Sequence, residues 1–189
     1  MLNYFFGFAL LINASPASAS IYQWFDGDNN GSLWLSNSVA EPYSDLSSEI
    51  LWWANLENAT LHHSHFVFSD LSFANLYEAN LSASDLSYSN LFNSNLENAD
   101  LSFTNFNGAD LQFSNMGNAN MFYANFINAN LSNVQNWDLS FWLAAKYNAN
   151  TAFPDGMNPV DYGMLYLEVP SPAVIPTFAM LFWLQRRRR

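Results

Sequence analysis

The sequence predicts an all-β solenoid, and three observations on residues 44–135 predict it. First, a large apolar residue (Leu, Phe or Met) recurs at every fifth position from Leu46 to Leu131, eighteen times without a break. Second, from Ala54 to Ala129 the position two residues earlier is always Ala, Ser or Thr. Third, the residue directly before the large one is mostly Asn or Asp. A period of five fits neither an α-helix nor a flat strand, so the chain must turn a corner in each repeat.

Two of every five residues are expected to point inward, one large and one small, while backbone hydrogen bonds join each coil to the next. Burial of the large side chains, at about 1.5–3 kcal/mol each, is the main stabilising term, and chain entropy offsets much of it. The predicted core stack consists of Leu51, Leu56, Leu61, Phe66, Leu71, Leu76, Leu81, Leu86, Leu91, Leu96, Leu101, Phe106, Leu111, Met116, Met121, Phe126 and Leu131.

The repeat unit is seen in Ala79-Asn80-Leu81 and in Ala99-Asp100-Leu101. It resembles the pentapeptide-repeat family, whose pattern is A-(D/N)-L-x-x, over about half of the chain. The resemblance implies a right-handed quadrilateral β-helix with four repeats per coil. Here that gives about 4–5 coils, flanked by N-terminal and C-terminal caps.

Folding the sequence four repeats at a time assigns a different surface to each side of the coil. One side carries an Asn ladder with polar and acidic neighbours, at Asn55, Asn75, Asn95 and Asn115. Aromatic residues recur on the other sides, and exposed aromatic stripes on a rigid solenoid suggest an interaction surface. Two alternatives remain open: the rings lie flat against the rod, or terminal segments cover them. The aromatic residues are Trp53, Phe68, Phe73, Tyr88, Phe103, Phe113 and Tyr123.

Residues 1–19 predict a secretory signal peptide. An apolar run over residues 4–12 is followed by Ala17-Ser18-Ala19, in which Ala17 and Ala19 fit the small-x-small pattern that a signal peptidase accepts. The run is short for a membrane span. A buried first strand is the alternative interpretation.

Residues 20–43 are predicted to form an N-terminal cap that contains a hairpin, with strands near residues 21–24 and 33–35. Between them, Asp26, Asp28 and Asn30 match the first half of a calcium-binding loop. The twelfth loop position is Asn37 where such loops need a bidentate Glu, and Gly, Asn and Asp are ordinary turn formers. The sequence therefore favours a turn over a metal site.

Residues 136–168 are predicted to form a C-terminal cap, with residues 146–156 folding over the last coil. Beyond it, the mostly apolar stretch 173–184 is followed by a basic cluster, a pattern typical of a stop-transfer signal whose basic end stays in the cytoplasm. An amphipathic C-terminal helix is the alternative, but no charge lies between Glu168 and Arg186.

Residues 169–189 resemble the PEP-CTERM sorting signal of bacterial envelope proteins, which combines a Pro-x-Pro motif, a short apolar helix and an Arg cluster. The resemblance implies recognition by an exosortase-like enzyme, transient membrane insertion, and cleavage near the Pro-x-Pro motif. Short apolar helices are thus expected at both ends of the chain. The matching residues are Val169, Pro170, Ser171, Pro172, Arg186, Arg187, Arg188 and Arg189.

The charge pattern excludes some classes of function. The net charge is −11, and four of the five basic residues lie in the terminal Arg cluster. Such an acidic body repels phosphates, so direct nucleic-acid binding is not expected. The absence of cysteine excludes disulfides and thiolate chemistry. His62, His63 and His65 are expected to point outward near one corner, as solvated side chains or a surface metal site.

The sequence contains no recognisable catalytic set, and no enzyme activity or cofactor is predicted. The predicted function is an exported structural or interaction module of the cell envelope or extracellular matrix, which presents a rigid surface to an unknown protein or glycan partner. Two alternatives remain: an acidic DNA mimic that binds a topoisomerase, and a surface carbohydrate-binding module.

Overall fold

The computed structural model describes the backbone of residues 19–23 and 34–168 and the side chains of residues 41–168. Several predicted features lie outside these residues: the signal peptide up to residue 18, the weak calcium candidate at Asp26, Asp28 and Asn30, the sorting tail 169–189, and the short apolar helices at both ends.

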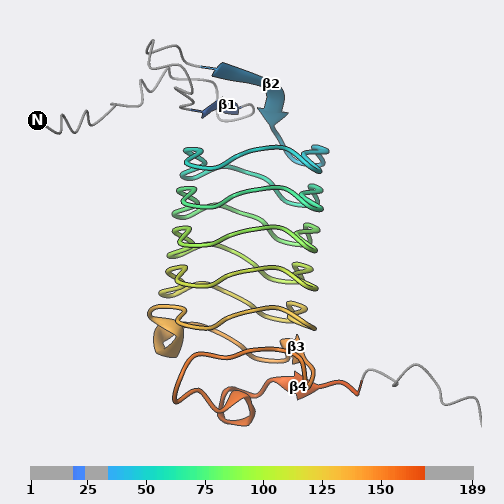
Figure 1. The fold of residues 1–189 in the computed structure, drawn as a ribbon, viewed down its shortest axis with the longest axis vertical. Coiled ribbons are helices and arrows are strands. Elements are labelled where there is room, and N and C mark those ends of the chain that lie inside the picture. Colours follow the sequence, from blue (N-terminus) through green and yellow to red (C-terminus); the bar gives the residue numbers. More distant parts are fainter. Residues whose placement is uncertain (1–18, 24–33, 169–189) are drawn as a thin grey trace, which may run out of the picture.

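Residues 45–152 form a stack of coils joined by four ladders of parallel β-bridges (Figure 1). In the regular part, bridge partners are twenty residues apart, as in Asn55 with Asn75 and Asn75 with Asn95. Four repeats of five residues therefore complete one coil. The predicted four-sided β-helix is confirmed, although between residues 45 and 141 each strand is only a single bridge long.

Backbone hydrogen bonds connect each coil to its neighbours in a repeating pattern. The Leu71 N–H donates to the Asn90 carbonyl at 2.7 Å, and the Asn90 N–H donates to the Ser69 carbonyl at 2.9 Å. Each ladder residue thus uses both its N–H and its C=O toward the preceding coil. Stacking satisfies backbone groups that a single coil would leave unpaired.

A tight turn forms each corner of the coil. In one such turn, the Ala54 N–H donates to the Leu51 carbonyl at 3.0 Å, and Trp53 has a φ of 59°. A bond from the fourth residue to the first, with positive φ at the third, is the signature of a type II turn. The same positive φ recurs at every fifth residue from Tyr43 to Asn133.

The core is the filled interior of the coil. All seventeen side chains of the predicted core stack are at most 1% exposed, which confirms their burial. The large residues stack on one another along each wall, as in Phe106 and Phe126, whose rings are parallel with centroids 5.1 Å apart. The small residues two positions earlier are buried as well, including Ala54 and Thr104.

At the N-terminal end, β1 (Ala19–Gln23) pairs antiparallel with β2 (Trp34–Ala40), in a register that joins Ala19 to Ala40 and Gln23 to Trp34. This confirms the pairing predicted for the hairpin. The two strands lie at the end of the stack where the first coil begins (Figure 1).

The predicted end of the β-helix at residue 135 is wrong, because the bridges continue to Ala152. The spacing between partners grows from twenty to twenty-one residues at Phe141 and to twenty-two at Ala152, so the five-residue period disappears although the coil continues. One extra residue enters near η1 (Trp137–Leu139) and the second enters between Lys146 and Ala152. Trp142, 1% exposed, then takes a core position, with its ring 5.5 Å from that of Phe126.

The last coil is closed by the segment that follows it. β3 (Lys146–Tyr147) pairs parallel with β4 (Leu165–Tyr166), and η2 (Pro159–Tyr162) lies between them in sequence. Met157 and Met164 are buried against the core from this segment. Residues 136–168 are therefore one further irregular coil together with its cover.

Candidate contact surface at the corners of the rod

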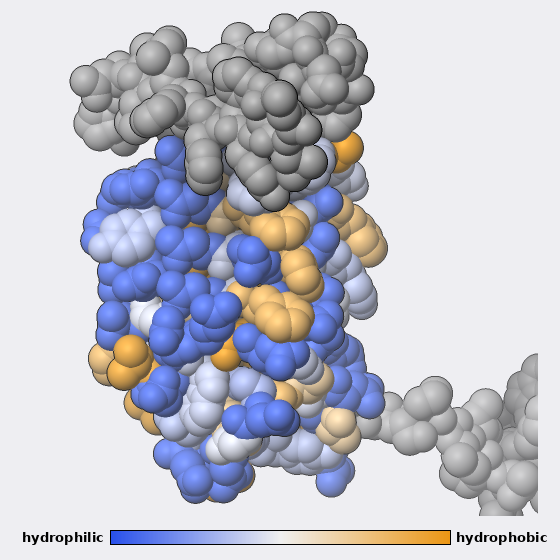
Figure 2. Space-filling model, turned by 60° about the vertical axis from the view of Figure 1, so that its left-hand side comes forward, coloured by the Kyte–Doolittle hydropathy of each residue, from blue (hydrophilic) through white to orange (hydrophobic). Residues whose placement is uncertain are grey.

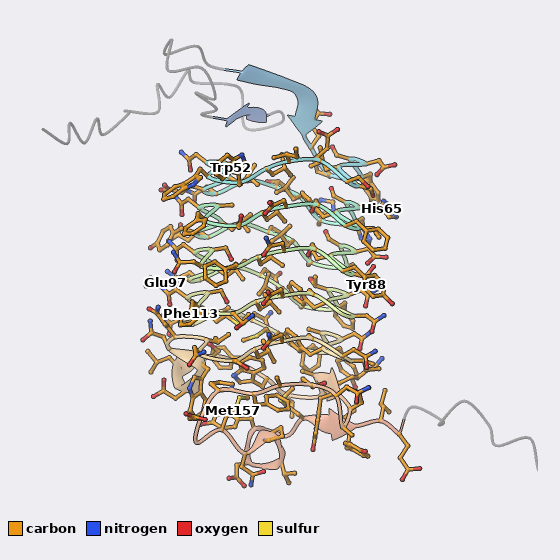
Figure 3. All side chains as sticks on the ribbon, in the orientation of Figure 1. Trp52, His65, Tyr88, Glu97, Phe113 and Met157 are labelled. Carbon is orange, nitrogen blue, oxygen red and sulfur yellow. The ribbon has the colours of Figure 1, made fainter. Side chains whose placement is uncertain are left out.

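The first aromatic column consists of Trp53, Phe73, Phe92 and Phe113, and it runs along one corner. Trp53 stacks on Phe73 with ring centroids 4.7 Å apart and planes 5° apart. Phe92 makes edge contacts with Phe73 at 5.7 Å and with Phe113 at 5.4 Å. In the space-filling view, hydrophobic side chains follow one another along the length of the rod between hydrophilic ones, on the side that carries Phe113 in Figure 3 (Figure 2).

Two further corners also carry rings. The second aromatic column is Phe68 and Tyr88, stacked at 5.1 Å, at the neighbouring corner of the coil; in the view of Figure 3, Tyr88 and Phe113 lie toward different edges of the rod. The third aromatic column is Phe103, Phe122 and Tyr123, in which Phe103 and Tyr123 stack at 5.5 Å with planes 2° apart. Because one coil separates stacked partners, the rings lie face to face along the rod axis.

Most of these rings are attached to a backbone that disfavours them. Trp53, Phe68, Phe103 and Tyr123 all have φ between 58° and 59°, in the left-handed region. A side chain there costs about 1–2 kcal/mol, and Asn or Gly tolerates the conformation much better than a bulky ring. Such strain persists only where the surrounding structure enforces it, and it is often associated with a functional surface.

Gly108 lets the second aromatic column lie against the next coil. A Cβ built on Gly108 would lie 2.7 Å from two carbons of the Tyr88 ring, and the φ of Gly108 is 70°. The Tyr88 hydroxyl accepts a hydrogen bond from Asn107 Nδ2 at 3.4 Å. Glycine is therefore required here for two reasons: a Cβ would collide with the Tyr88 ring, and the positive φ disfavours other residues.

The fourth corner differs in chemistry. Its left-handed positions carry polar residues, and its adjoining positions include Glu57 and Glu97. The Asn75 side chain donates to Glu57 at 3.1 Å, and that of Asn115 donates to Glu97 at 3.0 Å. A hydrogen bond with Glu78 is the main cause that raises the pKa of the Tyr77 hydroxyl. We call this the amide–acid corner; its left-handed residues are Asn58, Glu78, Asn98 and Asn118.

Side-chain ladders run along the faces between the corners. On the face next to the amide–acid corner, Asn75 donates to Asn55 at 3.2 Å and Asn95 donates to Asn75 at 3.2 Å. Asn115 continues the ladder at 3.4 Å, as the sequence predicted. In addition, each ladder oxygen accepts the backbone N–H two residues later, as in Glu97 to Asn95 at 3.2 Å.

Carboxylates in these ladders are kept apart. Asn90 lies between Asp70 and Asp110 and donates to Asp70 at 3.1 Å. None of the bridged pairs in residues 45–152 joins two Asp residues. An ionised Asp has acceptors only, so it can receive a bond from the next coil but cannot donate to the previous one. Asn between two Asp residues therefore supplies a donor and separates like charges.

The described surface is strongly acidic. Of the sixteen acidic residues, all except Asp26 and Asp28 lie within it, whereas Lys146 is its only basic residue. Hydrogen bonds from the side chain and backbone of Ser47 hold the pKa of Asp45 below its usual value, with a smaller contribution from His65. The field around the aromatic columns is thus negative over most of the rod.

The three histidines point outward, as predicted, but they do not form one cluster. His62 and His63 meet at a corner with ring centroids 5.4 Å apart, and Tyr43 stacks on His63 at 5.0 Å. His65 occupies a ladder position between Asp45 and Asp85. Residues 41–168 contain no group of three His, Asp or Glu side chains that could hold a metal ion.

Six of the seven aromatic residues predicted to be an interaction surface are exposed; Phe73 is only partly exposed because it packs between Trp53 and Phe92. Phe92 and Phe122 were not predicted; each precedes a left-handed position and completes a column by edge contacts. The sequence signal for them is an aromatic residue directly after the large core residue of the repeat.

Comparison with protein-family models identifies pentapeptide repeats in eight copies, over residues 54–91, 84–121 and 99–135. This match implies a right-handed quadrilateral β-helix. A search of curated proteins gave no match. No helix within residues 19–23 and 34–168 has the length and apolar character needed to cross a bilayer.

Solved structures similar to this chain include three pentapeptide repeat proteins. One, from the thylakoid lumen of Arabidopsis thaliana, is 25% identical over 48% of this chain and 63% of its own, with a TM-score of 0.47. A protein from Nostoc PCC 7120 is 27% identical over 55% of this chain and 84% of its own, with a TM-score of 0.41. A protein from the cyanobacterium Cyanothece 51142 is 30% identical over 52% of this chain and 63% of its own, with a TM-score of 0.35.

Proposed function

Residues 54–135 are pentapeptide repeats, and on that premise we propose that the chain is a non-catalytic interaction module of the cell envelope or extracellular matrix. It is exported, and it presents the aromatic corners of a rigid β-helix to a protein partner. Pentapeptide-repeat proteins are generally structural or interaction proteins, which supports this class of function.

The observation that carries the proposal is the presence of large rings at left-handed backbone positions of three corners. At the amide–acid corner the same positions carry Asn58, Asn98 and Asn118, so the fold accepts residues that suit the conformation better. Rings at the other corners therefore lower the stability of the rod, although the same fold would form with Asn at these positions. A contact surface explains that cost, because aromatic residues are enriched at the centres of protein interfaces.

The orientation of the rings favours a protein partner over a glycan. Carbohydrate recognition by stacking would need an open ring face. The inner faces of Trp53 and Phe73 lie against each other with planes 5° apart, as do those of Phe103 and Tyr123 at 2°. The ring edges that remain carry the positive part of the aromatic quadrupole and suit aromatic faces or carbonyl oxygens. Glycan-array binding that is lost in Trp53→Ala would contradict this choice.

The acidic surface favours a second candidate, a DNA mimic that binds a cationic groove on an enzyme such as a topoisomerase. Lys146 is the only cation that opposes the carboxylates of the described residues, and charge of one sign steers oppositely charged partners. This candidate requires a cytoplasmic protein, whereas the interaction module requires an exported one.

The location of the protein distinguishes the two candidates. We propose that the signal peptide is removed after Ala19 and that an exosortase-like enzyme recognises residues 169–189 and cleaves near Pro170–Pro172. The apolar stretch 173–184 enters the membrane before that step. Cell fractionation with mass spectrometry of both termini tests this. We expect envelope or extracellular protein that begins near Ser20; cytoplasmic protein with both ends intact contradicts the proposal and favours the DNA mimic.

A further inference from the structure

The last coil replaces polar ladder residues with apolar ones. Phe141 continues the ladder of Asn120 and is 65% exposed, and Leu165 continues the ladder of Asn125 and Lys146 and is 45% exposed. In the earlier coils these two ladders carry Asn, Asp, His and Thr. Ladder side chains point to the outside of the rod, so the substitution creates apolar surface at this end.

Other apolar residues of the same coil join this surface. Leu143 lies against Gly163, where an added Cβ would be 2.9 Å from a Leu143 methyl group, and Val160 belongs to η2. η2 and β4 lie at the end of the rod opposite β1 and β2 (Figure 1). We define the apolar collar as six of the exposed apolar residues of this end: Phe141, Leu143, Val160, Leu165, Tyr166 and Leu167.

The collar lies next to the point where the chain leaves the rod. Glu168 is the last described residue, and the apolar stretch begins at Ala173, five residues later. Five extended residues span at most about 18 Å. If the stretch 173–184 lies in a bilayer, the end of the rod that carries the collar is held within that distance of the lipid surface.

We propose that the apolar collar docks on the surface of a zwitterionic lipid bilayer while the tail is inserted. The rod axis is then roughly perpendicular to the membrane, and the aromatic columns, which run along that axis, extend away from the lipid surface. This inference rests on the membrane insertion of residues 173–184 given under the proposed function. Tyr166 suits the interface, because its ring is apolar and its hydroxyl remains hydrated.

The charges around the collar select the type of lipid. Asp155, Asp161 and Glu168 belong to the same segment, and Lys146 is the one cation near them in the described chain. An anionic headgroup layer repels such a surface over about a Debye length. We therefore expect collar contact with phosphatidylcholine vesicles, and weaker contact when half of the lipid is phosphatidylglycerol.

Site-specific fluorescence on the full chain tests the proposal, and the absence of cysteine allows single labels to be placed freely. Three variants carry a polarity-sensitive probe: Thr177→Cys in the tail, Leu143→Cys in the collar, and Ala83→Cys at the same corner three coils away. Each is reconstituted in phosphatidylcholine vesicles that contain a lipid-borne quencher near the headgroups. Circular dichroism of each labelled protein verifies the fold.

We expect lipid quenching at Thr177→Cys and Leu143→Cys, at least threefold stronger at each than at Ala83→Cys. The substitutions Phe141→Asn and Leu165→Asn, which restore polar ladder residues, should reduce quenching at Leu143→Cys at least twofold and leave Thr177→Cys unchanged. Quenching at Thr177→Cys with none at Leu143→Cys contradicts the docking of the collar but still supports insertion of the tail in the membrane.

Two other outcomes overturn the proposal in distinguishable ways. No quenching at Thr177→Cys contradicts the inserted tail and therefore the proposed function as well. A Leu143→Cys probe that is shielded from water but not reached by the lipid quencher indicates a second copy of the chain on the collar. Sedimentation velocity without vesicles would then reveal a dimer that Phe141→Asn with Leu165→Asn dissociates.

Discussion

The aromatic corners and the amide–acid corner share one backbone and differ only in their side chains. At Phe113 φ is 60° and at Asn118, one repeat later, it is 57°. In the regular coils the turn and the bonds to the next coil are of the same kind at both types of corner: the Phe103 N–H donates to the Phe122 carbonyl and the Asn98 N–H to the Gly117 carbonyl, each at 2.8 Å. The backbone therefore does not determine which side chain projects outward. The comparison teaches that the core and turn residues determine the fold of the rod. The corner side chains do not determine the fold, so they can vary according to what they contact.

The core supports both kinds of corner, so a core cavity should affect them together. Leu91→Ala leaves a cavity between Leu71 and Leu111 and should lower the free energy of unfolding by about 3 kcal/mol, as for other fully buried Leu residues. Denaturant titration measures this. Leu139→Ala, at a site that is 56% exposed, is the control and should change it by less than about 0.5 kcal/mol. Equal effects of the two substitutions would contradict a common filled core.

The ladders separate the corners, and their order of Asn and Asp can be broken by one substitution. Asn90→Asp removes the bond to Asp70 and places three carboxylates in consecutive coils with Asp110. We expect a loss of about 2 kcal/mol at neutral pH from the lost bond and the repulsion. At about pH 3 the carboxyls are largely protonated and the repulsive part should disappear.

Asn118→Asp, on the exposed amide–acid corner, is the matched control for Asn90→Asp and should change stability by less than about 0.5 kcal/mol. Thermal unfolding at the two pH values compares the variants. A deficit in Asn90→Asp that does not depend on pH would mean that charge separation has no role in the ladder.

The second aromatic column makes a contact that the amide–acid corner lacks, and it can be measured at Gly108. Gly108→Ala should cost about 1–2 kcal/mol from its positive φ and from the Tyr88 ring. In the background of Tyr88→Ala the ring is absent and the cost should fall by at least about 0.5 kcal/mol. A double-mutant cycle measured by denaturant unfolding gives the coupling, and strict additivity would contradict the close packing.

The smallest effect comes from exchanging side chains between the two kinds of corner. Asn98→Phe should lower stability by about 1 kcal/mol, because Phe tolerates the left-handed conformation poorly. Phe103→Asn gains from the conformation and loses the stacking on Tyr123, so we expect a net change below about 1 kcal/mol. If Phe103→Asn destabilised the rod by several kcal/mol, the rings would be structural and the argument for a contact surface would fail.

The features that follow from the five-residue period were predicted from the sequence, whereas the features of the last coil, where that period is interrupted, were not. Burial of residues such as Leu71 and Phe106, the Asn55 ladder and the four-sided coil all follow from which repeat position faces inward. The extra length near η1 carries no local signal, so Trp142 was not recognised as a core residue.

The corner surface was predicted only in part, because ring contacts depend on side-chain direction. Spacing alone identified Trp53 and Tyr88 as exposed. It did not reveal that Phe92 joins the first aromatic column from the preceding position, or that Phe73 is shielded on both sides. The apolar collar was missed because it lies beyond the regular repeats, where no register assigns residues to the outside.

Photo-crosslinking in the cells that produce the protein tests the central claim most directly. A benzophenone amino acid replaces Phe113 in one strain and Asn118 in another; both are exposed corner residues with positive φ, one repeat apart. The account predicts a discrete crosslinked protein adduct from position 113 and none from position 118. Equal adducts at both positions, or none at position 113 while the protein is folded and exported, would contradict it.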